Sequence, residues 1–286
     1  MIPRTKFRLC LPSRTLVLGE RTLIMGVLNV TPDSFSDGGK FLKPQVAVAY
    51  ALEMERAGAD ILDIGGESTR PESKALRANE ELGRILPVLK MLRGRLKIPI
   101  SVDTQKVEVA QAAISAGAEI VNDISALRFD NEIAGLVARQ KAGIILMHMR
   151  GKPRTMQKGP FARDVMRDVI KGLSDALRRA KQAGIERRQI LLDPGIGFGK
   201  NYRQNFEILA GLPELAQLGY PFVVGTSRKS FIGAALDNVP AEQRAWGTAA
   251  TVAASILGGA HIVRVHDVKE MAQVAKIADR VAAARS

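Results

Sequence analysis

The chain has 286 residues, 46% of them hydrophobic, which is enough for one large domain or two ordinary ones with a substantial core. Its 42 basic and 29 acidic side chains give a net charge of +13, which favours either an anionic partner or simply a basic, solvated surface. A lone cysteine excludes an internal disulfide, and no apolar run is long enough for a secretion signal or a membrane span, so we expect a cytoplasmic protein.

The first predicted element is a hairpin over residues 6–20, after which short apolar runs alternate with helical patterns. Several of these runs follow glycine and small residues, as in AGADILDIGG from residue 57, which is typical of a buried parallel strand entered from the end of a helix. Eight strands are predicted, at residues 23–29, 61–64, 100–103, 120–122, 143–147, 190–193, 222–225 and 262–265. The helical patterns lie near residues 44–58, 79–92, 105–116, 131–142, 164–183, 203–218, 242–258 and 267–284.

This alternation of strand and helix predicts a parallel sheet with helices outside it. Eight such units match the roughly 250 residues of a (β/α)8 barrel. A doubly wound open sheet is the alternative, but it has fewer strands and a G-x-G-x-x-G segment after the first, where this chain has NVTPDSFSDGG. No linker divides the chain. We therefore predict an α/β fold with a single domain over residues 1–286, a TIM barrel whose bottom is closed by the N-terminal hairpin.

The predicted strands end in polar side chains, at the end of a barrel where catalytic residues lie. Taken singly, each could cap a helix or form a turn, as Asp103 and Asn29 could. Helix capping does not account for polar residues at nearly every strand end, so a functional interpretation is favoured. The residues concerned are Asn29, Asp63, Asp103, Asn122, Asp123, His148, Asp193, Arg264 and His266.

Two kinds of chemistry are present in this set and in the adjoining loops. One group combines carboxylates, an amide and a cation, which together can bind the hydrogen-bonding edge of a flat, guanidine-like heterocycle. It consists of Asp103, Asn122, Asp193 and Lys229. The other group is suited to phosphate oxygens and a divalent cation. It consists of Asn29, Arg70, Arg264 and His266.

The segment LLDPGIGFGK, residues 191–200, has the glycine and lysine of a phosphate-binding loop but not its first glycine or its hydroxyl residue, which are replaced by proline and asparagine. We interpret it as the end of a strand followed by a close-packed turn. Asp193 would then contact the ring and Phe198 would face it. Lys200 would be a solvated residue at the entrance of a helix.

Segments along nearly the whole chain match a known family in order. They are MGVLNVTPDSFSDGG (25–39), DIGGESTRP (63–71), SVDT (101–104), VNDI (121–124), MHMRGKPRTMQ (147–157), LLDPGIGFGK (191–200), GTSRKSFIG (225–233) and IVRVHDV (262–268). On these segments the chain closely resembles the dihydropteroate synthase family of pterin-binding enzymes, the targets of sulfonamides. The resemblance implies a transferase of folate biosynthesis that joins 6-hydroxymethyl-7,8-dihydropterin pyrophosphate to p-aminobenzoate, releasing pyrophosphate and 7,8-dihydropteroate, with Mg²⁺ assisting.

The resemblance also implies a role for each matching position. The pterin would be bound by Asp103, Asn122, Met147, Asp193, Phe198 and Lys229. The catalytic residues among them would be Asp103, Asp193 and Lys229. Pyrophosphate would be bound by Asn29, Arg70, Arg264 and His266, and the metal would be contacted by Asn29. p-Aminobenzoate would be bound by Phe35, Thr69, Pro71, Lys229 and Ser230.

The same resemblance implies two mobile loops over the site, at residues 30–40 and 66–75. It also implies a homodimer in which the last helices form the contact, and Trp246 would lie either in such an interface or in the core. For the reaction we expect dissociative loss of pyrophosphate followed by attack of the amine, because a pterin ring can delocalise positive charge on its methylene carbon.

Other functions are alternatives. A pterin-binding methyltransferase barrel would share Asp103, Asn122 and Asp193 but would not need the phosphate-binding group. A second alternative is an inactive relative of the synthases, although every matching position carries a residue able to perform the implied role. A nucleic-acid binder would explain the charge, but it predicts aromatic residues interleaved with basic ones, and aromatic residues make up only 5% of the chain.

Overall fold

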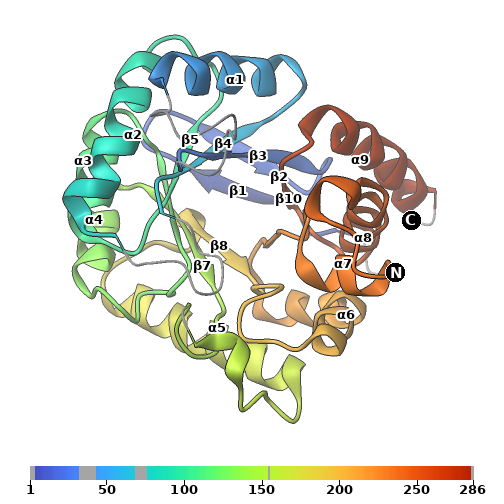
Figure 1. Cartoon of the computed structure of the whole chain (residues 1–286). Helices are drawn as coiled ribbons and strands as arrows, with labels where there is room; N and C mark the ends of the chain where they lie inside the picture. Colours follow the sequence, from blue (N-terminus) through green and yellow to red (C-terminus); the bar gives the residue numbers. More distant parts are fainter. Residues whose placement is uncertain (1–3, 32–42, 68–75, 154, 285–286) are drawn as a thin grey trace.

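The fold is a parallel β-barrel surrounded by helices. The computed structural model describes residues 4–31, 43–67, 76–153 and 155–284. In this part of the chain eight strands follow the order β8, β7, β6, β5, β4, β3, β10, β9, and neighbouring strands are parallel. A parallel bridge between Leu192 and Phe222 joins the two ends of this row, so the barrel is nearly closed (Figure 1). The strands are β3 (Leu23–Asn29), β4 (Ile61–Gly65), β5 (Ile100–Asp103), β6 (Ile120–Asp123), β7 (Gly143–Met147), β8 (Ile190–Asp193), β9 (Val223–Val224) and β10 (Ile262–Val265).

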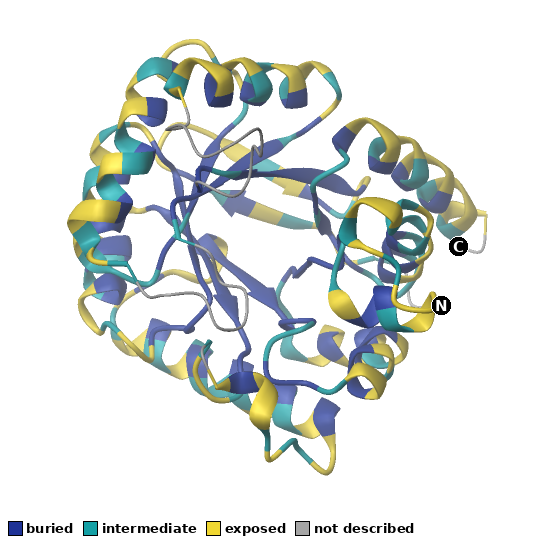
Figure 2. Cartoon of the chain, in the orientation of Figure 1, coloured by how far each residue is buried: buried dark blue, intermediate teal, exposed yellow. Residues whose placement is uncertain are grey.

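The helices form an outer ring, with one side turned to the strands and the other to solvent (Figure 2). In α5, for example, the Asp164 side chain caps the first turn by accepting from the Arg167 backbone N–H at 3.0 Å. Buried Val169, Leu173 and Ala176 follow on one face at helical spacing. The helices are α1 (Pro44–Arg56), α2 (Ala78–Leu92), α3 (Val107–Ser115), α4 (Glu132–Gln140), α5 (Val165–Gln182), α6 (Tyr202–Gly211), α7 (Ser230–Ala235), α8 (Ala245–Leu257) and α9 (Val268–Ala283).

An antiparallel hairpin of β1 (Phe7–Cys10) and β2 (Thr15–Leu18) covers one end of the barrel. Leucines of both hairpin strands, Leu9 among them, are buried in one apolar cluster with residues from the lower ends of the barrel strands. The hairpin loop is tied down where the Ser13 hydroxyl donates to the Glu119 carboxylate at 2.7 Å. The prediction that the N-terminal hairpin closes the barrel bottom is confirmed.

The structure departs from the predicted elements in two places. The helix predicted over 203–218 is α-helical only to Gly211 and continues as a 3-10 segment, Leu212–Leu218. The reason is Pro213, which has no N–H to donate back to the preceding turn. The short helix α7 was not predicted; its single run of small and apolar residues, SFIGAA, is too short for a helical period to be read from it.

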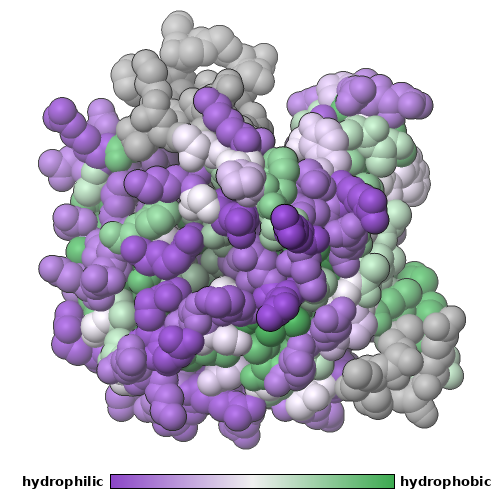
Figure 3. All heavy atoms as spheres, turned by 90° about the horizontal axis from the view of Figure 1, so that it is seen from below, coloured by the Kyte–Doolittle hydropathy of each residue, from purple (hydrophilic) through white to green (hydrophobic). Residues whose placement is uncertain are grey.

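No helix in the described residues is both long and apolar enough to cross a membrane. Seen from below Figure 1, where α5 lies, the molecule presents a largely hydrophilic surface (Figure 3). Trp246, at the start of α8, is 86% exposed. Its predicted place in the core is therefore wrong for this chain alone, and its place in an interface stays a prediction.

Candidate active site

Strand alternation places the predicted site residues inside the barrel. Successive side chains of a strand point to opposite faces, so residues two apart share a face. The lower inward layer, beside the hairpin, is apolar and consists of Leu23, Met25, Ile61, Ile120, Ile145, Leu191, Val223 and Ile262. The inward positions above this layer follow by steps of two along each strand, with Val27 between Met25 and Asn29, and Ser101 below Asp103 on β5. They include Asn29, Asp63, Asp103, Asn122, Met147, Asp193 and Arg264.

Strand register brings three of these positions into one row with Gly65 of β4. Asn29 is opposite Gly65, Gly65 is opposite Asp103, and Asp103 is opposite Asn122. A side chain on Gly65 would begin 3.6 Å from Asn29 Oδ1 and 3.5 Å from Asp103 Cβ. The glycine therefore leaves a gap about the size of a methyl group between the asparagine and the aspartate.

A buried carboxylate, Asp63, ties the two predicted groups together. The Arg264 guanidinium donates to Asp63 Oδ2 at 2.6 Å and to Asp103 Oδ2 at 3.0 Å. The Asn122 amide donates to the same Asp63 oxygen at 3.1 Å. Burial raises the pKa of Asp103 to about 7, and Arg264 limits that rise. An arginine from the phosphate-binding group thus lies directly against two members of the ring-binding group.

The other half of the ring-binding group lies on the opposite side of the barrel mouth. Asp193 ends β8 and pairs in register with Met147 at the end of β7. Lys229 donates to the Ile196 carbonyl, and its ammonium lies 4.9 Å from the centre of the Phe198 ring. Phe198 in turn packs on the apolar cluster that contains Met147.

Charge links this side to the first. Burial lowers the pKa of Lys229 to about 8, while the carboxylates of Asp193 and Asp103 raise it. Burial likewise raises the pKa of Asp193, and Lys229 and Arg264 oppose that rise. The three charged residues of the ring-binding group therefore form one electrostatic site with Arg264, in which Lys229 and Arg264 each act on both carboxylates.

Two of the remaining predicted residues, His266 and Ser230, lie in the segments that follow the barrel strands, and the others lie outside the described residues. His266 follows β10, and its ring Nδ1 lies 3.0 Å from the Ser227 hydroxyl. Ser230 is exposed and opens α7 next to Lys229. Outside the described residues lie Phe35, Thr69, Arg70 and Pro71. The predicted loops 30–40 and 66–75 fall largely outside them as well.

Comparison with known proteins identifies the family. The model of the pterin-binding enzyme family matches residues 25–266. The dihydropteroate synthase of Synechocystis sp. is 51% identical over 261 residues, which are 91% of this chain and 90% of that protein. The chain belongs to the dihydropteroate synthase family of pterin-binding enzymes. It is an enzyme of the transferase class, and its TIM-barrel fold is the one that was predicted.

Solved structures of relatives agree with this family assignment. The Xanthomonas albilineans dihydropteroate synthase with 4-aminobenzoic acid is 42% identical, has a TM-score of 0.90 and matches 97% of this chain and 98% of its own. The same bacterium's enzyme in complex with 7,8-dihydropteroate is 40% identical, with a TM-score of 0.86 and coverage of 96% and 98%. These relatives hold 4-aminobenzoic acid and 7,8-dihydropteroate on the same fold.

Two residues near the site differ from the sequence interpretation. Lys200 is not solvated: its side chain is only 2% exposed, and its ammonium contacts three backbone carbonyls and the His148 ring. Asp63 was seen as a polar strand residue but was given no role. The signal was its position in the middle of the apolar strand ILDIG, where there is no helix to cap. A charged side chain buried there needs partners inside the barrel.

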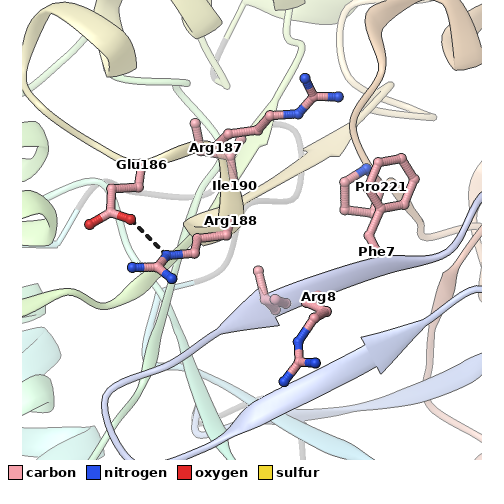
Figure 4. A pocket seen from close by; sticks show the side chains of 8 residues that line it. Phe7, Arg8, Glu186, Arg187, Arg188, Ile190 and Pro221 are labelled. Atoms are coloured by element: carbon pink, nitrogen blue, oxygen red, sulfur yellow. Dashed lines mark hydrogen bonds and ion pairs between the residues drawn. The ribbon is translucent and has the colours of Figure 1, made fainter.

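A separate hollow of about 310 Å³ lies at the hairpin end of the barrel (Figure 4). Three arginines line it, but Arg188 is turned to Glu186, with 2.7 Å between Nε and Oε2, and Arg187 lies over the Tyr220 ring at 5.0 Å. None of the predicted site residues that the structure describes lines this hollow. The candidate active site is therefore the upper, polar layer of the barrel.

Proposed function

We propose that the chain condenses 6-hydroxymethyl-7,8-dihydropterin pyrophosphate with p-aminobenzoate to give 7,8-dihydropteroate and pyrophosphate. The observation that carries the proposal is the meeting of Asp103, Asn122, Asp193 and Lys229 with Arg264 in one polar layer at the barrel mouth. A pterin binder that transfers a methyl group has no need of a pyrophosphate-binding arginine at this place.

The ring is recognised by the carboxylates and the amide. A pterin presents adjacent N–H donors and a carbonyl, and a carboxylate can accept two such donors in parallel. Asp193 has one oxygen already oriented by the Gly195 backbone N–H at 2.6 Å. Asn122 supplies an amide and Lys229 a donor for the ring carbonyl, while Met147 and Phe198 form an apolar wall.

The diphosphate is bound on the β3 and β10 side. Arg264 and His266 come from β10 and the residue following it, and Asn29 ends the adjacent strand β3. We include Arg70 in this group from the sequence. Cations at this position stabilise the charge that develops on the departing pyrophosphate.

The residues present fit a magnesium ion that would be contacted by Asn29 and otherwise coordinated by water and substrate, and not by protein side chains alone. The described residues contain no cluster of three or more His, Cys, Asp or Glu side chains able to hold a metal. Mg²⁺ commonly takes one or two protein oxygens and completes its shell with water and substrate phosphates, which matches a lone amide oxygen beside the diphosphate. When bound there, it would neutralise charge on the leaving group.

The reaction proceeds by dissociation in this proposal. The C–O bond to pyrophosphate breaks first, and the electron pair leaves with the phosphate. Asp103 and Asp193 favour the resulting cationic ring. The neutral amine of p-aminobenzoate then attacks the methylene carbon and loses a proton, so no strong base is required. The amine is held beside Lys229 and Ser230, together with Phe35, Thr69 and Pro71.

The function is tested by following pyrophosphate release and dihydropteroate formation with and without p-aminobenzoate and Mg²⁺. We expect product only when both substrates are present, and stimulation by Mg²⁺. Methyl transfer from methyltetrahydrofolate with no pyrophosphate release would instead favour the methyltransferase. For the dissociative step, ¹⁸O in the bridging position should scramble into non-bridging positions when the enzyme is incubated with the pterin pyrophosphate and Mg²⁺ but without p-aminobenzoate. Retention of the label in the bridging position under those same conditions would contradict it.

We also propose a homodimer and a cytoplasmic location. The dimer is supported by large apolar side chains that α8 and α9 expose: Trp246 is 86% exposed and Ile277 is 68% exposed. The location is supported by the single cysteine, which suits a reducing compartment.

A further inference from the structure

Lys200 is a buried lysine that belongs to neither of the two predicted groups of site residues. It follows the turn after β8, and its ammonium reaches back beneath that turn. There it donates to the carbonyls of Gly195 at 2.7 Å and of Pro194 and His148 at 3.0 Å each, and it lies 3.0 Å from His148 Nδ1. One side chain thus joins the segments that follow β7 and β8.

The partners of His148 define the proton arrangement around this lysine. Burial lowers the pKa of His148 to about 4, so its ring is neutral near pH 7. Its Nε2 lies 3.5 Å from one carboxylate oxygen of Asp168. The other oxygen of Asp168 pairs with Arg150 at 3.0 Å. A neutral ring with its proton on Nε2 can donate to Asp168 and accept from Lys200 on Nδ1.

These contacts lead directly to Asp193. The Gly195 backbone N–H donates to Asp193 Oδ1 at 2.6 Å, and the His148 backbone N–H donates to the Asp193 carbonyl at 2.9 Å. Lys200 binds the carbonyls of the same two residues. The turn is closely packed, since Gly195 has φ +68° and a Cβ on it would lie 1.8 Å from the His148 carbonyl oxygen. The Pro194 carbonyl that Lys200 binds belongs to the same peptide group as the Gly195 N–H, so the lysine fixes the peptide group that orients the Asp193 carboxylate.

Charge acts in the same direction. Burial raises the pKa of Asp193, and Lys200 is one of the cations that oppose this rise. Burial lowers the pKa of Lys200 itself to about 7, and Asp193 raises it. The ammonium is thus a counter-charge for the carboxylate as well as a donor to the turn beneath it.

We propose that Lys200 is a positioning residue for the pterin site, holding the turn after β8 so that Asp193 meets the ring in its ionised, oriented form. The inference rests on the proposed function, because it assumes that the ligand of Asp193 is a pterin. It assigns Lys200 no contact with either substrate.

The test is a double-mutant cycle with Lys200→Met, Asp193→Asn and the double variant. Each is measured for its KM for the pterin pyrophosphate, its KM for p-aminobenzoate and its Kd for 6-hydroxymethyl-7,8-dihydropterin by calorimetry. Lys200→Met should weaken pterin binding about tenfold, the size expected for losing hydrogen bonds from a charged group. In the Asp193→Asn background the same change should cost less than about twofold. The KM for p-aminobenzoate should stay within about twofold throughout.

The matched control is Gln189→Met at the opposite end of β8. Gln189 is also buried and donates to the Ala142 carbonyl at 2.7 Å, far from the barrel mouth. It should lower thermal stability without changing pterin affinity. Should Lys200→Met fail to fold, Lys200→Gln keeps an N–H₂ donor and should show the same selective loss, smaller in size.

The outcomes separate the two proposals. If the wild-type chain neither binds the pterin nor forms product, the proposed function is wrong. If the wild-type chain is active but the two substitutions have additive effects, or Lys200→Met behaves like Gln189→Met, then only the positioning role is wrong.

Discussion

At the scale of single residues, burial raises the pKa of Asp193 and so opposes the negative charge that the proposed reaction uses. Asp193→Asn keeps the shape but removes the carboxylate, so we expect kcat to fall by about 30- to 1000-fold, as when one electrostatic stabiliser is lost. The control is Asp237→Asn, at an exposed aspartate in a left-handed turn that asparagine also tolerates. Steady-state kinetics on both variants measures the difference in kcat between them. Similar values of kcat for the two would refute a role for the Asp193 charge.

The pH dependence of the reaction should report the ionisation of Asp103 and Lys229. Asp103, with its pKa raised to about 7, is protonated below that pH and cannot accept two ring donors. Lys229, with its pKa lowered to about 8, loses its charge above that pH. kcat/KM for the pterin pyrophosphate should therefore rise up to about pH 7 and fall beyond about pH 8.

Substitutions assign the two limbs of this profile. Asp103→Asn should remove the acidic limb, and Lys229→Met should remove the fall near pH 8, each with a lower maximum. The smaller fall that Lys200 gives as it loses its charge above about pH 7 should remain in Lys229→Met. An acidic limb that persists unchanged in Asp103→Asn would show that another group titrates there.

A residue's place in the site could be predicted from the sequence mainly where the residue lies at the end of a strand or in the loop that follows it. Asp103, Asn122 and Asp193 were found in that way, and the resemblance to a family then gave them roles. Lys200 was misplaced because a lysine after a glycine-rich turn is usually solvated. Its burial depends on the packing of Gly195 against the His148 carbonyl, a contact between segments about fifty residues apart in sequence.

At the scale of elements, most strands begin and end where the apolar runs do, because a parallel strand covered on both faces must be apolar throughout. Three further features lie beyond that pattern. The α6 break at Pro213 and the short α7 depend on local backbone chemistry, and the near closure between β8 and β9 rests on one bridge, Leu192 to Phe222.

The last residue of β4 gives a prediction at this scale. A methyl group at Gly65 would meet Asp103 and Asn29 at ordinary contact distances, so Gly65→Ala should fold, but it would fill the gap between them. We expect its KM for the pterin pyrophosphate to rise about tenfold, as for a ligand displaced from its hydrogen bonds. The comparison is Gly83→Ala on α2, where a methyl meets nothing within 4 Å. That variant should keep its KM and gain about 0.5–1 kcal/mol of stability; an unchanged KM for Gly65→Ala would exclude the gap as part of the site.

At the scale of the whole molecule, the exposed apolar side chains of α8 and α9 favour pairing of two copies. Trp246→Glu combined with Ile277→Glu should convert a dimer to a monomer in analytical ultracentrifugation, because charge cannot be buried there without a partner. Exposed Val17→Glu on the hairpin is the control. A wild-type monomer at micromolar concentration, or a dimer unaffected by the pair of substitutions, would contradict this contact.

The barrel as a whole brings together residues separated by more than two hundred positions, such as Asp63 and Arg264. The most direct test of that convergence as a pterin site is a crystal structure of this chain with 7,8-dihydropteroate. The account predicts that the edge of the ring lies about 3 Å from Asp193, Asn122 and Lys229, with Asp103 in the same layer. A ring bound outside the upper barrel layer, or one that touches neither Asp103 nor Asp193, would contradict it.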